Sequence, residues 1–234
     1  MSRNSFTEKL KNKILALDKE IIVEKLTDNY MSEPRGRFNN YALFVVRPEN
    51  VQQVSKIVTF LNEEKIGVIP FSGGTGLVGG QLASKGEKSI LLSLDKMSKI
   101  RNFSYEDNTI TVEAGVILSN IQNYVNEKKK YFPLSLASEG SCQIGGNLAT
   151  NAGGINVIKY GNARDLCLGL EAVLPDGSIY NGLKSLLKDN TGYDIKNLLI
   201  GSEGTLGIIT AATLKLYPKP KDTYVSLIAL NNFD

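Results

Sequence analysis

Hydrophobic and polar residues alternate along the chain in a pattern of short strands and helices. Apolar side chains recur at helical spacing in three segments, which predicts amphipathic helices at residues 5–15, 51–64 and 117–127. Short apolar or alternating runs predict strands at residues 41–46, 66–71, 89–94, 100–103, 109–114, 167–174, 178–180, 208–216 and 223–230.

The order of these elements indicates an α/β (α+β) fold. Strand, helix and strand follow one another over residues 41–71, which predicts a small lobe with parallel strand pairing. The Asp176-Gly177 pair predicts a hairpin between the strands on either side of it. Residues 28–40 are polar and contain Pro34 and Gly36, so we expect a connector there.

A glycine-rich loop, SGGTGLVGG, follows the predicted strand at residues 66–71. It holds five glycines within residues 72–80. Glycine accepts positive φ angles and leaves room for a ligand to approach the backbone amides. Successive amide N–H groups in such a loop form a concave site for anions. The loop therefore predicts a cradle for phosphate groups.

Two common phosphate-binding motifs do not fit this loop. A P-loop requires a lysine after its second glycine, but Gly80 and Gln81 follow Gly79. Gly74, Gly76 and Gly79 have the spacing of a Rossmann turn, yet a loop-type sequence follows where that fold needs a helix. Taken alone, the loop would also be compatible with a plain flexible turn.

Two further glycine-rich blocks change this interpretation. They are EGSCQIGGNLATNAGG at residues 139–154 and GSEGTLGIIT at residues 201–210. Together with the first loop they contain 13 of the 22 glycines. Three separated loops rich in Gly, Ser, Thr and Asn suggest that several backbone segments close around one extended ligand.

Composition narrows the class of protein. The 234 residues are 42% hydrophobic and 22% charged, which is typical of a globular protein. The net charge is +3 and the charges are interspersed, so nothing points to nucleic acid. The basic run at residues 128–130 is expected to be a solvated helix end. No 18-residue apolar stretch is present, which predicts no transmembrane segment and a cytoplasmic location, with peripheral contact to a membrane as the alternative.

The chain contains no histidine and two cysteines, Cys142 and Cys167, that lack a C-x-x-C spacing. The absence of histidine removes the commonest general base and metal ligand. We therefore predict no metal site and no catalytic residue within these 234 residues.

Several motifs together resemble one family. The chain is similar to the FAD-binding domain of the vanillyl-alcohol oxidase/PCMH-type flavoproteins, and within it to the D-2-hydroxy acid dehydrogenases (D-2-hydroxyglutarate dehydrogenase, D-lactate dehydrogenase and the glycolate oxidase subunit GlcD). The motifs that carry the resemblance are VRP-x-x-x-x-x-V (46–54), PFSGGTGLVGG (70–80), EGSCQIGGNLATNAGG (139–154), KYGNARD (159–165), LKDNTGYD (187–194) and IGSEGTLGIIT (200–210).

This resemblance implies a PCMH-type fold of two α/β lobes with FAD in an extended pose between them. The first loop would meet the pyrophosphate and shape the approach of the flavin, and the other two blocks would line the rest of the cofactor. The FAD-binding positions that the resemblance assigns are Pro70, Ser72, Gly73, Gly74, Thr75, Gly76, Leu77, Gly79, Gly80, Pro133, Ser135, Ser141, Gly145, Gly146, Asn147, Thr150, Asn151, Gly154, Glu203, Gly204 and Ile208.

Some positions depart from the family pattern. Thr75 stands where some relatives attach flavin through a histidine, so the resemblance implies non-covalent FAD. Ser135 stands where close relatives often have Asp, and Cys142 is expected to be a small packed residue. Tyr160, Lys188 and Asp194 lie within matched motifs and are expected to be structural.

The largest departure is length. The resembled enzymes are roughly twice as long, and their C-terminal cap domain supplies the histidine base, the metal ligands and the arginine that holds the substrate. We predict an N-terminal helical extension (1–39), a PCMH-type domain (40–220) and the start of a connection to a cap that is absent here (221–234).

The resemblance implies part of an enzyme that oxidises a D-2-hydroxy acid to the 2-oxo acid by hydride transfer to flavin N5. Its partners would be the hydroxy acid and a separately encoded cap chain or an electron acceptor. Two alternatives stay open at this point. One is a flavin-binding module without turnover, and the other is a reductase that uses a nucleotide donor.

Overall fold

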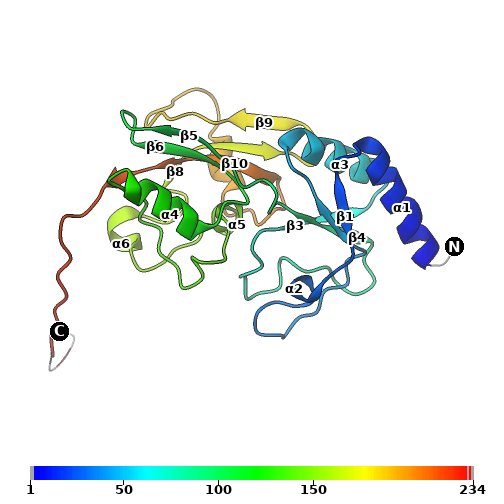
Figure 1. The fold of residues 1–234 in the computed structure, drawn as a ribbon, viewed down its shortest axis with the longest axis horizontal. Coiled ribbons are helices and arrows are strands. Elements are labelled where there is room, and N and C mark those ends of the chain that lie inside the picture. Colours follow the sequence, from blue (N-terminus) through cyan, green and yellow to red (C-terminus); the bar gives the residue numbers. More distant parts are fainter. Residues whose placement is uncertain (1–2, 231, 233–234) are drawn as a thin grey trace.

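A computed structural model describes residues 3–230 and 232 of the chain. Two lobes lie side by side, each built on its own β-sheet (Figure 1). The four-stranded sheet of the first lobe has the order β1-β2-β4-β3, and the five-stranded sheet of the second lobe has the order β5-β6-β10-β8-β9. The predicted α/β class is correct.

The first lobe contains the predicted parallel unit. Strands β2 (Val45–Arg47) and β3 (Gly67–Phe71) both pair in parallel with β4 (Ser89–Ser93), and β1 (Ile22–Glu24) pairs antiparallel with β2. Helix α3 (Val51–Glu63) joins β2 to β3 and begins where the Asn50 side chain accepts a hydrogen bond from the Gln53 amide. This cap is the reason that the helix begins directly after the Pro-Glu-Asn turn.

The core of the first lobe includes the N-terminal helix α1 (Arg3–Leu17). Its buried Leu10 and Ile14 belong to the same hydrophobic cluster as Val54 of α3 and Ile90 of β4. Figure 1 shows α1 and α3 next to each other at the end of the molecule that carries the N-terminus. The division of the chain at residues 40 and 220 stays a prediction.

The second lobe is an antiparallel sheet covered by helices. Its strands are β5 (Ile100–Ser104), β6 (Thr109–Glu113), β8 (Cys167–Val173), β9 (Ile179–Gly182) and β10 (Ile208–Lys215). The predicted hairpin at Asp176-Gly177 joins β8 to β9. The remaining elements are α4 (Leu118–Glu127), β7 (Lys130–Tyr131), α5 (Ile144–Ala149), α6 (Val157–Tyr160), α7 (Ile195–Leu199) and β11 (Tyr217–Pro218).

Apolar side chains of α4 and α5 form the core of the second lobe with the sheet. Leu118 and Ile121 of α4 and Leu148 of α5 share one cluster with Ile110 of β6 and Leu214 of β10. Figure 1 shows these helices together on one side of the five-stranded sheet. The position of α5 is therefore fixed by burial, since its sequence is rich in glycine and has little helical propensity.

The two lobes are packed together over a continuous contact. Ala114, Val173 and Ile208 of the second lobe belong to the hydrophobic cluster of the first lobe. The Ser55 hydroxyl of α3 donates a hydrogen bond of 2.6 Å to the Gly177 carbonyl in the β8–β9 hairpin. The lobes thus have a fixed relation, which allows loops from both to build one site.

A polar network joins four strands of the second lobe. Arg101 of β5 donates to Glu113 of β6 at 3.2 Å and to Glu171 of β8 at 3.1 Å, and Thr210 donates to Glu171 at 2.8 Å. Both carboxylates are almost completely buried. Burial disfavours the charge of Arg101, but the hydrogen bonds and the attraction of Glu171 and Glu113 outweigh this effect and raise its pKa.

Two sequence-based expectations are wrong. Residues 223–230 form no strand; they extend away from both lobes, and Val225 is 93% exposed (Figure 1). Alternation shows which side chains would share a face, but it supplies no neighbouring strand to pair with. The other error concerns one residue of the basic run. Lys128 and Lys129 are exposed at the end of a helix as expected, but Lys130 is buried, and its ammonium group lies 3.8 Å from the centre of the Tyr105 ring.

The predicted connector also contains regular structure. Helix α2 (Asp28–Met31) lies within residues 28–40, and the expected strand at residues 41–46 is limited to β2. Tyr41 and Leu43 still bond to neighbouring segments, since their amides donate to Ala83 and Ser89 carbonyls. Four residues make only one helical turn, which is too short for a hydrophobic period to reveal.

Candidate functional site

A cavity of about 370 Å³ opens between the two lobes, within the size range of small-molecule sites. All three glycine-rich blocks contribute to its wall. Of the 21 predicted FAD-binding residues, 14 line this cavity, namely Pro70, Ser72, Gly74, Thr75, Gly76, Leu77, Gly80, Gly145, Gly146, Asn147, Thr150, Glu203, Gly204 and Ile208.

The other seven predicted residues are not part of the cavity lining. They are Gly73, Gly79, Pro133, Ser135, Ser141, Asn151 and Gly154. Several lie where two segments touch. A Cβ on Gly73 would lie 2.6 Å from the Ser141 carbonyl oxygen, and one on Gly154 would lie 2.1 Å from the Ser135 carbonyl oxygen. These contacts fit a structural role behind the site.

Sequence reasoning did not assign nine of the residues that line the cavity. Seven lie inside or directly beside the glycine-rich blocks, so their neighbours were the only available signal. Leu94 and Leu136 come from other segments that the fold alone brings here. The nine are Val78, Gln81, Leu94, Leu136, Ser138, Ala149, Ala152, Gly207 and Ile209.

The first glycine loop follows β3 and turns back at Gly74. Gly74 has φ +65°, and a Cβ there would lie 2.5 Å from the edge of the Phe71 ring. Only glycine fits both the backbone angle and the space. Farther along the loop, the Gln81 side-chain amide donates to the Gly76 carbonyl at 2.7 Å, which closes the loop on itself.

The second block forms α5, whose first turn packs against the first loop. The Gly146 amide donates to the Ser72 hydroxyl oxygen at 2.9 Å. The Gly145 amide donates to the Ala114 carbonyl at 2.8 Å, and a Cβ on Gly145 would lie 2.6 Å from the Ala114 Cβ. Glycine is required here because α5 lies directly against the end of β6 and the first loop.

The third block begins after α7 and forms part of the cavity wall at Glu203. The Glu203 amide donates to the Ala149 carbonyl at 2.9 Å, and its backbone has φ +52°. A Cβ on Gly204 would lie 2.9 Å from the Pro70 ring. The third loop therefore touches the strand that leads into the first loop.

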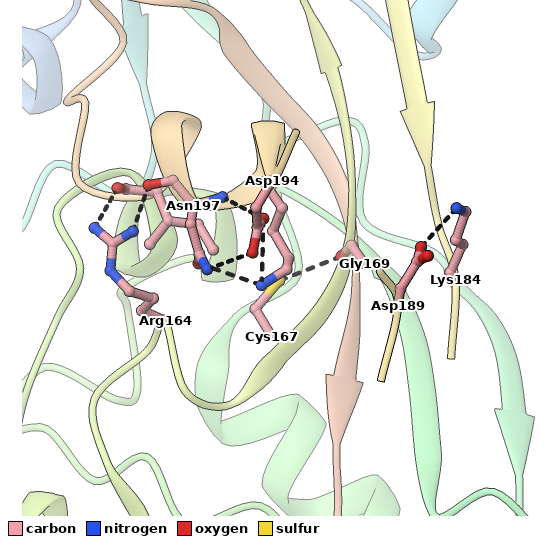
Figure 2. Close-up of polar contacts among 9 residues, drawn as sticks. Arg164, Cys167, Gly169, Lys184, Asp189, Asp194 and Asn197 are labelled. Carbon is pink, nitrogen blue, oxygen red and sulfur yellow. Dashed lines mark hydrogen bonds and ion pairs between the residues drawn. The ribbon is translucent and has the colours of Figure 1, made fainter. Parts of the chain in front are cut away.

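Arg164 of the KYGNARD motif supports both the second and third blocks (Figure 2). Its guanidinium donates to the backbone carbonyls of Asn197 and Ile200, the latter at 2.7 Å. Its backbone amide donates to the Asn151 side chain at 3.0 Å. One residue thus ties the end of α7, where the third block starts, to the segment that follows α5.

The LKDNTGYD motif supports the same helix. The Asp194 carboxylate accepts from the Asn197 amide at 3.1 Å and so caps α7 (Figure 2). Tyr160 packs edge-on between Tyr131 and Tyr217, with ring centres 5.9 and 4.8 Å away. These contacts are structural, as expected for Tyr160 and Asp194.

Neither cysteine takes part in the cavity. Cys142 is buried in the core of the second lobe, which confirms the expectation of a small packed residue. The Cys167 thiol donates to the Gly169 carbonyl at 3.2 Å, and burial raises its pKa to about 12 (Figure 2). A thiol with so high a pKa is a poor nucleophile.

The chemistry of the lining fits an extended, partly anionic cofactor. No lysine or arginine is among the described residues that line the cavity, and Glu203 is the one with an ionisable carboxylate. Backbone amides and the hydroxyls of Ser72 and Thr75 are neutral donors suited to a pyrophosphate, whereas the Thr150 hydroxyl already donates to the Gly146 carbonyl at 2.8 Å. The buried Asn147 side-chain oxygen has no hydrogen-bond partner within the protein, so it can accept from a ligand hydroxyl or imide group.

Comparison with solved structures identifies the class of fold. Alkyldihydroxyacetonephosphate synthase superposes with a TM-score of 0.70 at 24% sequence identity, covering 80% of this chain and 34% of that one. A variant of Phl p 4 described as a glucose oxidase superposes with a TM-score of 0.73 at 19% identity, covering 88% and 43%. The chain thus has the two-lobed fold of PCMH-type flavoproteins.

The chain belongs to the family described as FAD binding domain, whose model matches residues 42–182, and FAD is its cofactor. It is 41% identical over 207 residues to D-2-hydroxyglutarate dehydrogenase of Xanthomonas citri pv. viticola, which covers 88% of this chain and 43% of that protein. It is 44% identical over 189 residues to the mitochondrial D-2-hydroxyglutarate dehydrogenase of Danio rerio, covering 81% and 35%. The chain therefore spans less than half the length of these relatives.

Among the described residues, no helix is both long and apolar enough to span a bilayer.

Proposed function

We propose that this chain is the FAD-binding part of a dehydrogenase that oxidises a D-2-hydroxy acid to the 2-oxo acid. The observation that carries the proposal is the convergence of three glycine-rich blocks on one cavity with neutral donors. The relatives named D-2-hydroxyglutarate dehydrogenase and D-lactate dehydrogenase, at 41% and 42% identity, support the substrate class.

The residues of the first loop have defined roles in this proposal. Ser72, Gly74, Thr75 and Gly76 offer backbone and hydroxyl donors to the pyrophosphate, and Leu77 and Gly80 border the flavin end. Gly145, Gly146 and Asn147 contact the cofactor from α5, and Glu203, Gly204 and Ile208 close the far side. Thr75 offers no imidazole for a covalent bond to flavin, so the cofactor is held by non-covalent contacts alone.

The bound FAD supplies the hydride acceptor for the α-hydrogen of the substrate. A second group must accept the proton of the α-hydroxyl. The described cavity offers Glu203 as its one ionisable side chain, and this residue is one of the positions proposed to bind FAD. We propose that the base and the substrate-binding groups come from a cap domain, carried by a separate chain or by a further part of the same protein.

Two measurements test this proposal in order. Purified protein should bind FAD, seen as a yellow colour that denaturation releases, and folded protein that stays colourless in excess FAD would contradict the proposed site. Anaerobic bleaching of the flavin by a panel of D-2-hydroxy acids, with and without a cap chain, then tests the reaction. Bleaching by the D but not the L enantiomers is the expected result.

A flavin-binding module without turnover is the alternative. It is favoured by the same lining, because Glu203 is the one ionisable side chain among the described residues there. The two proposals differ in one outcome. A module alone would bind FAD tightly, yet no hydroxy acid would bleach it even when a cap chain is added.

We propose that the protein is located in the cytoplasm, with peripheral contact to a membrane surface as the alternative. Fractionation of cells that express the tagged chain would distinguish the two.

A further inference from the structure

The segment that precedes the family match folds along the first glycine loop. Residues 28–40, named here the clasp, were expected to be a polar connector. They contain α2 and a turn at residues 33–37, and they reach the loop at three separate points. These points lie before, within and after the glycine-rich stretch 72–80.

The first point is an aromatic contact beneath the start of the loop. The Tyr30 ring meets the Phe71 ring edge-on, with centres 4.8 Å apart. Phe71 is buried, and its ring occupies the space in which a Cβ of Gly74 would lie. Tyr30 therefore holds the ring against which the sharp turn of the loop is built.

The second point lies near the end of the glycine-rich stretch. The Phe38 ring lies against Gly79, close enough that a Cβ there would be 3.2 Å from the ring. Gly79 has φ +80°, and its neighbour Gly80 lines the cavity. Phe38 is 49% exposed, so its position is not that of an ordinary core residue.

The third point fixes the end of the loop. The buried Asn40 side-chain oxygen accepts from the amides of Ala42 and Ala83, each at 3.0 Å, and its amide donates to the Tyr30 carbonyl at 2.8 Å. One side chain thus connects both ends of the clasp to Ala83, which follows the glycine-rich stretch.

A nearly buried carboxylate holds the clasp in shape. Glu33 is 1% exposed and accepts from the amides of Arg35 at 2.6 Å and Arg37 at 2.5 Å. These bonds fold the turn that presents Phe38. Because the carboxylate accepts hydrogen bonds from these backbone amides in place of water, the geometry of the turn depends on the Glu33 side chain.

The loop needs such support for a physical reason. Five glycines in residues 72–80 give the unfolded loop large conformational freedom, which must be lost when a ligand is bound. A loop that is already ordered binds more tightly because this entropy is lost on folding instead.

We infer that the clasp pre-orders the first glycine loop for the cofactor, with Phe38 and Glu33 as positioning residues that do not themselves touch it. The inference rests on the proposed placement of the FAD pyrophosphate on this loop. It extends the binding device of the protein to residues that precede the matched family segment 42–182.

The test compares Phe38→Ala with a rescue variant and a matched control. Phe38→Tyr keeps the ring contact with Gly79. Tyr105→Ala removes an aromatic side chain that is 58% exposed in the second lobe and contacts Lys130. For each full-length variant, the dissociation constant for FAD, the thermal midpoint without FAD, and amide hydrogen exchange of residues 72–83 without FAD are measured.

We expect Phe38→Ala to weaken FAD binding at least tenfold, with a shift in thermal midpoint no larger than that of Tyr105→Ala. Hydrogen exchange of residues 72–83 should rise in Phe38→Ala and return to the wild-type level in Phe38→Tyr. Either wild-type affinity for FAD or wild-type exchange of residues 72–83 in Phe38→Ala would overturn the inference.

The exchange measurement separates this inference from the proposed site. If wild-type protein does not bind FAD, the proposed site fails, while faster exchange of residues 72–83 in Phe38→Ala still supports the ordering role of the clasp. If FAD binds to Phe38→Ala as to the wild type, the clasp inference fails and the site stands.

Discussion

The sharpest test of the cavity is a substitution at Gly74, the turn of the first glycine loop. Its backbone has φ +65°, which costs an ordinary L-residue about 1–2 kcal/mol. A Cβ would also lie 2.5 Å from the Phe71 ring, which is buried against Tyr30 and has little room to move. Overpacking of this kind costs about 1–3 kcal/mol.

Together these two costs amount to about 2–5 kcal/mol. In the unbound Gly74→Ala protein the loop can shift and relieve them, whereas FAD binding requires the wild-type loop shape. We therefore expect Gly74→Ala to lose about 2–5 kcal/mol of binding free energy for FAD. Gly74→Asp adds a negative charge beside the site proposed for a dianionic pyrophosphate. Unit charges about 4 to 8 Å apart repel by about 4 to 2 kcal/mol at an effective dielectric constant of about 20. Each 1.4 kcal/mol is about tenfold in affinity, so Gly74→Asp should abolish measurable binding.

The assay is titration of the apoprotein with FAD, followed by the quenching of flavin fluorescence at fixed ionic strength. Gly86→Asp is the matched control, because Gly86 also has a positive φ of +92° but a Cβ there meets nothing within 4 Å. It places the same charge and similar backbone strain on an exposed turn outside the cavity lining. Folded Gly74→Asp that binds FAD within threefold of the wild type would refute the phosphate cradle.

Three other predictions follow from the described contacts. Ser72→Ala removes the hydroxyl that accepts from the Gly146 amide and that can donate to the ligand. FAD binding should therefore weaken about tenfold, a loss of about 1.4 kcal/mol. Unchanged affinity in the same titration would contradict this. Arg101→Met leaves Glu113 and Glu171 buried without their cation, so the free energy of unfolding measured in urea should fall by about 3 kcal/mol. Lys219→Met, at an exposed position, is the control and should leave the free energy of unfolding almost unchanged. Equal losses in the two variants would argue against a stabilising role of the network. Burial acts to raise the pKa of Glu33, but hydrogen bonds from the amides of residues 35, 37 and 38 and the charge of Arg37 outweigh it and lower this pKa below 4.5. Since the folded pKa of Glu33 is depressed, the stabilisation by its carboxylate is present above pH 4.5 and is lost as the pH falls through the folded value. The difference in thermal midpoint between wild type and Glu33→Gln should therefore narrow below pH 4.5. A difference that stays constant with pH would contradict this role of the Glu33 carboxylate.

Strong local periodicity made much of the first lobe predictable from the sequence. Helix α3 carries an apolar stripe and an Asn50 cap, and the strands on either side of it are short apolar runs, so its parallel pairing was predicted correctly. The hairpin at Asp176-Gly177 was also predictable, because its turn residues accept the required backbone angle without help from distant residues.

Elements that depend on burial against distant residues could not be predicted from the sequence. Helix α5 lies inside a glycine-rich block and is stabilised by packing of Leu148 in the second-lobe core. Residues 223–230 show the reverse case, since their alternation suits a strand but the described fold gives them no partner. Lys130 was misread for a similar reason, because Tyr105 and Asn108, which surround it, come from the β5–β6 turn.

The sequence by itself determined the family, the cofactor and most of the cavity wall, because glycine-rich loops carry their conformational requirements in the residues themselves. Tertiary structure alone decided that Gly73 and Gly154 lie where neighbouring segments touch and not in the cavity lining, and that Leu94 and Leu136 complete the wall. It also decided that residues 28–40 form a clasp. Contacts such as Phe38 on Gly79 join segments about 40 residues apart, and no local pattern encodes which distant surface a side chain will meet.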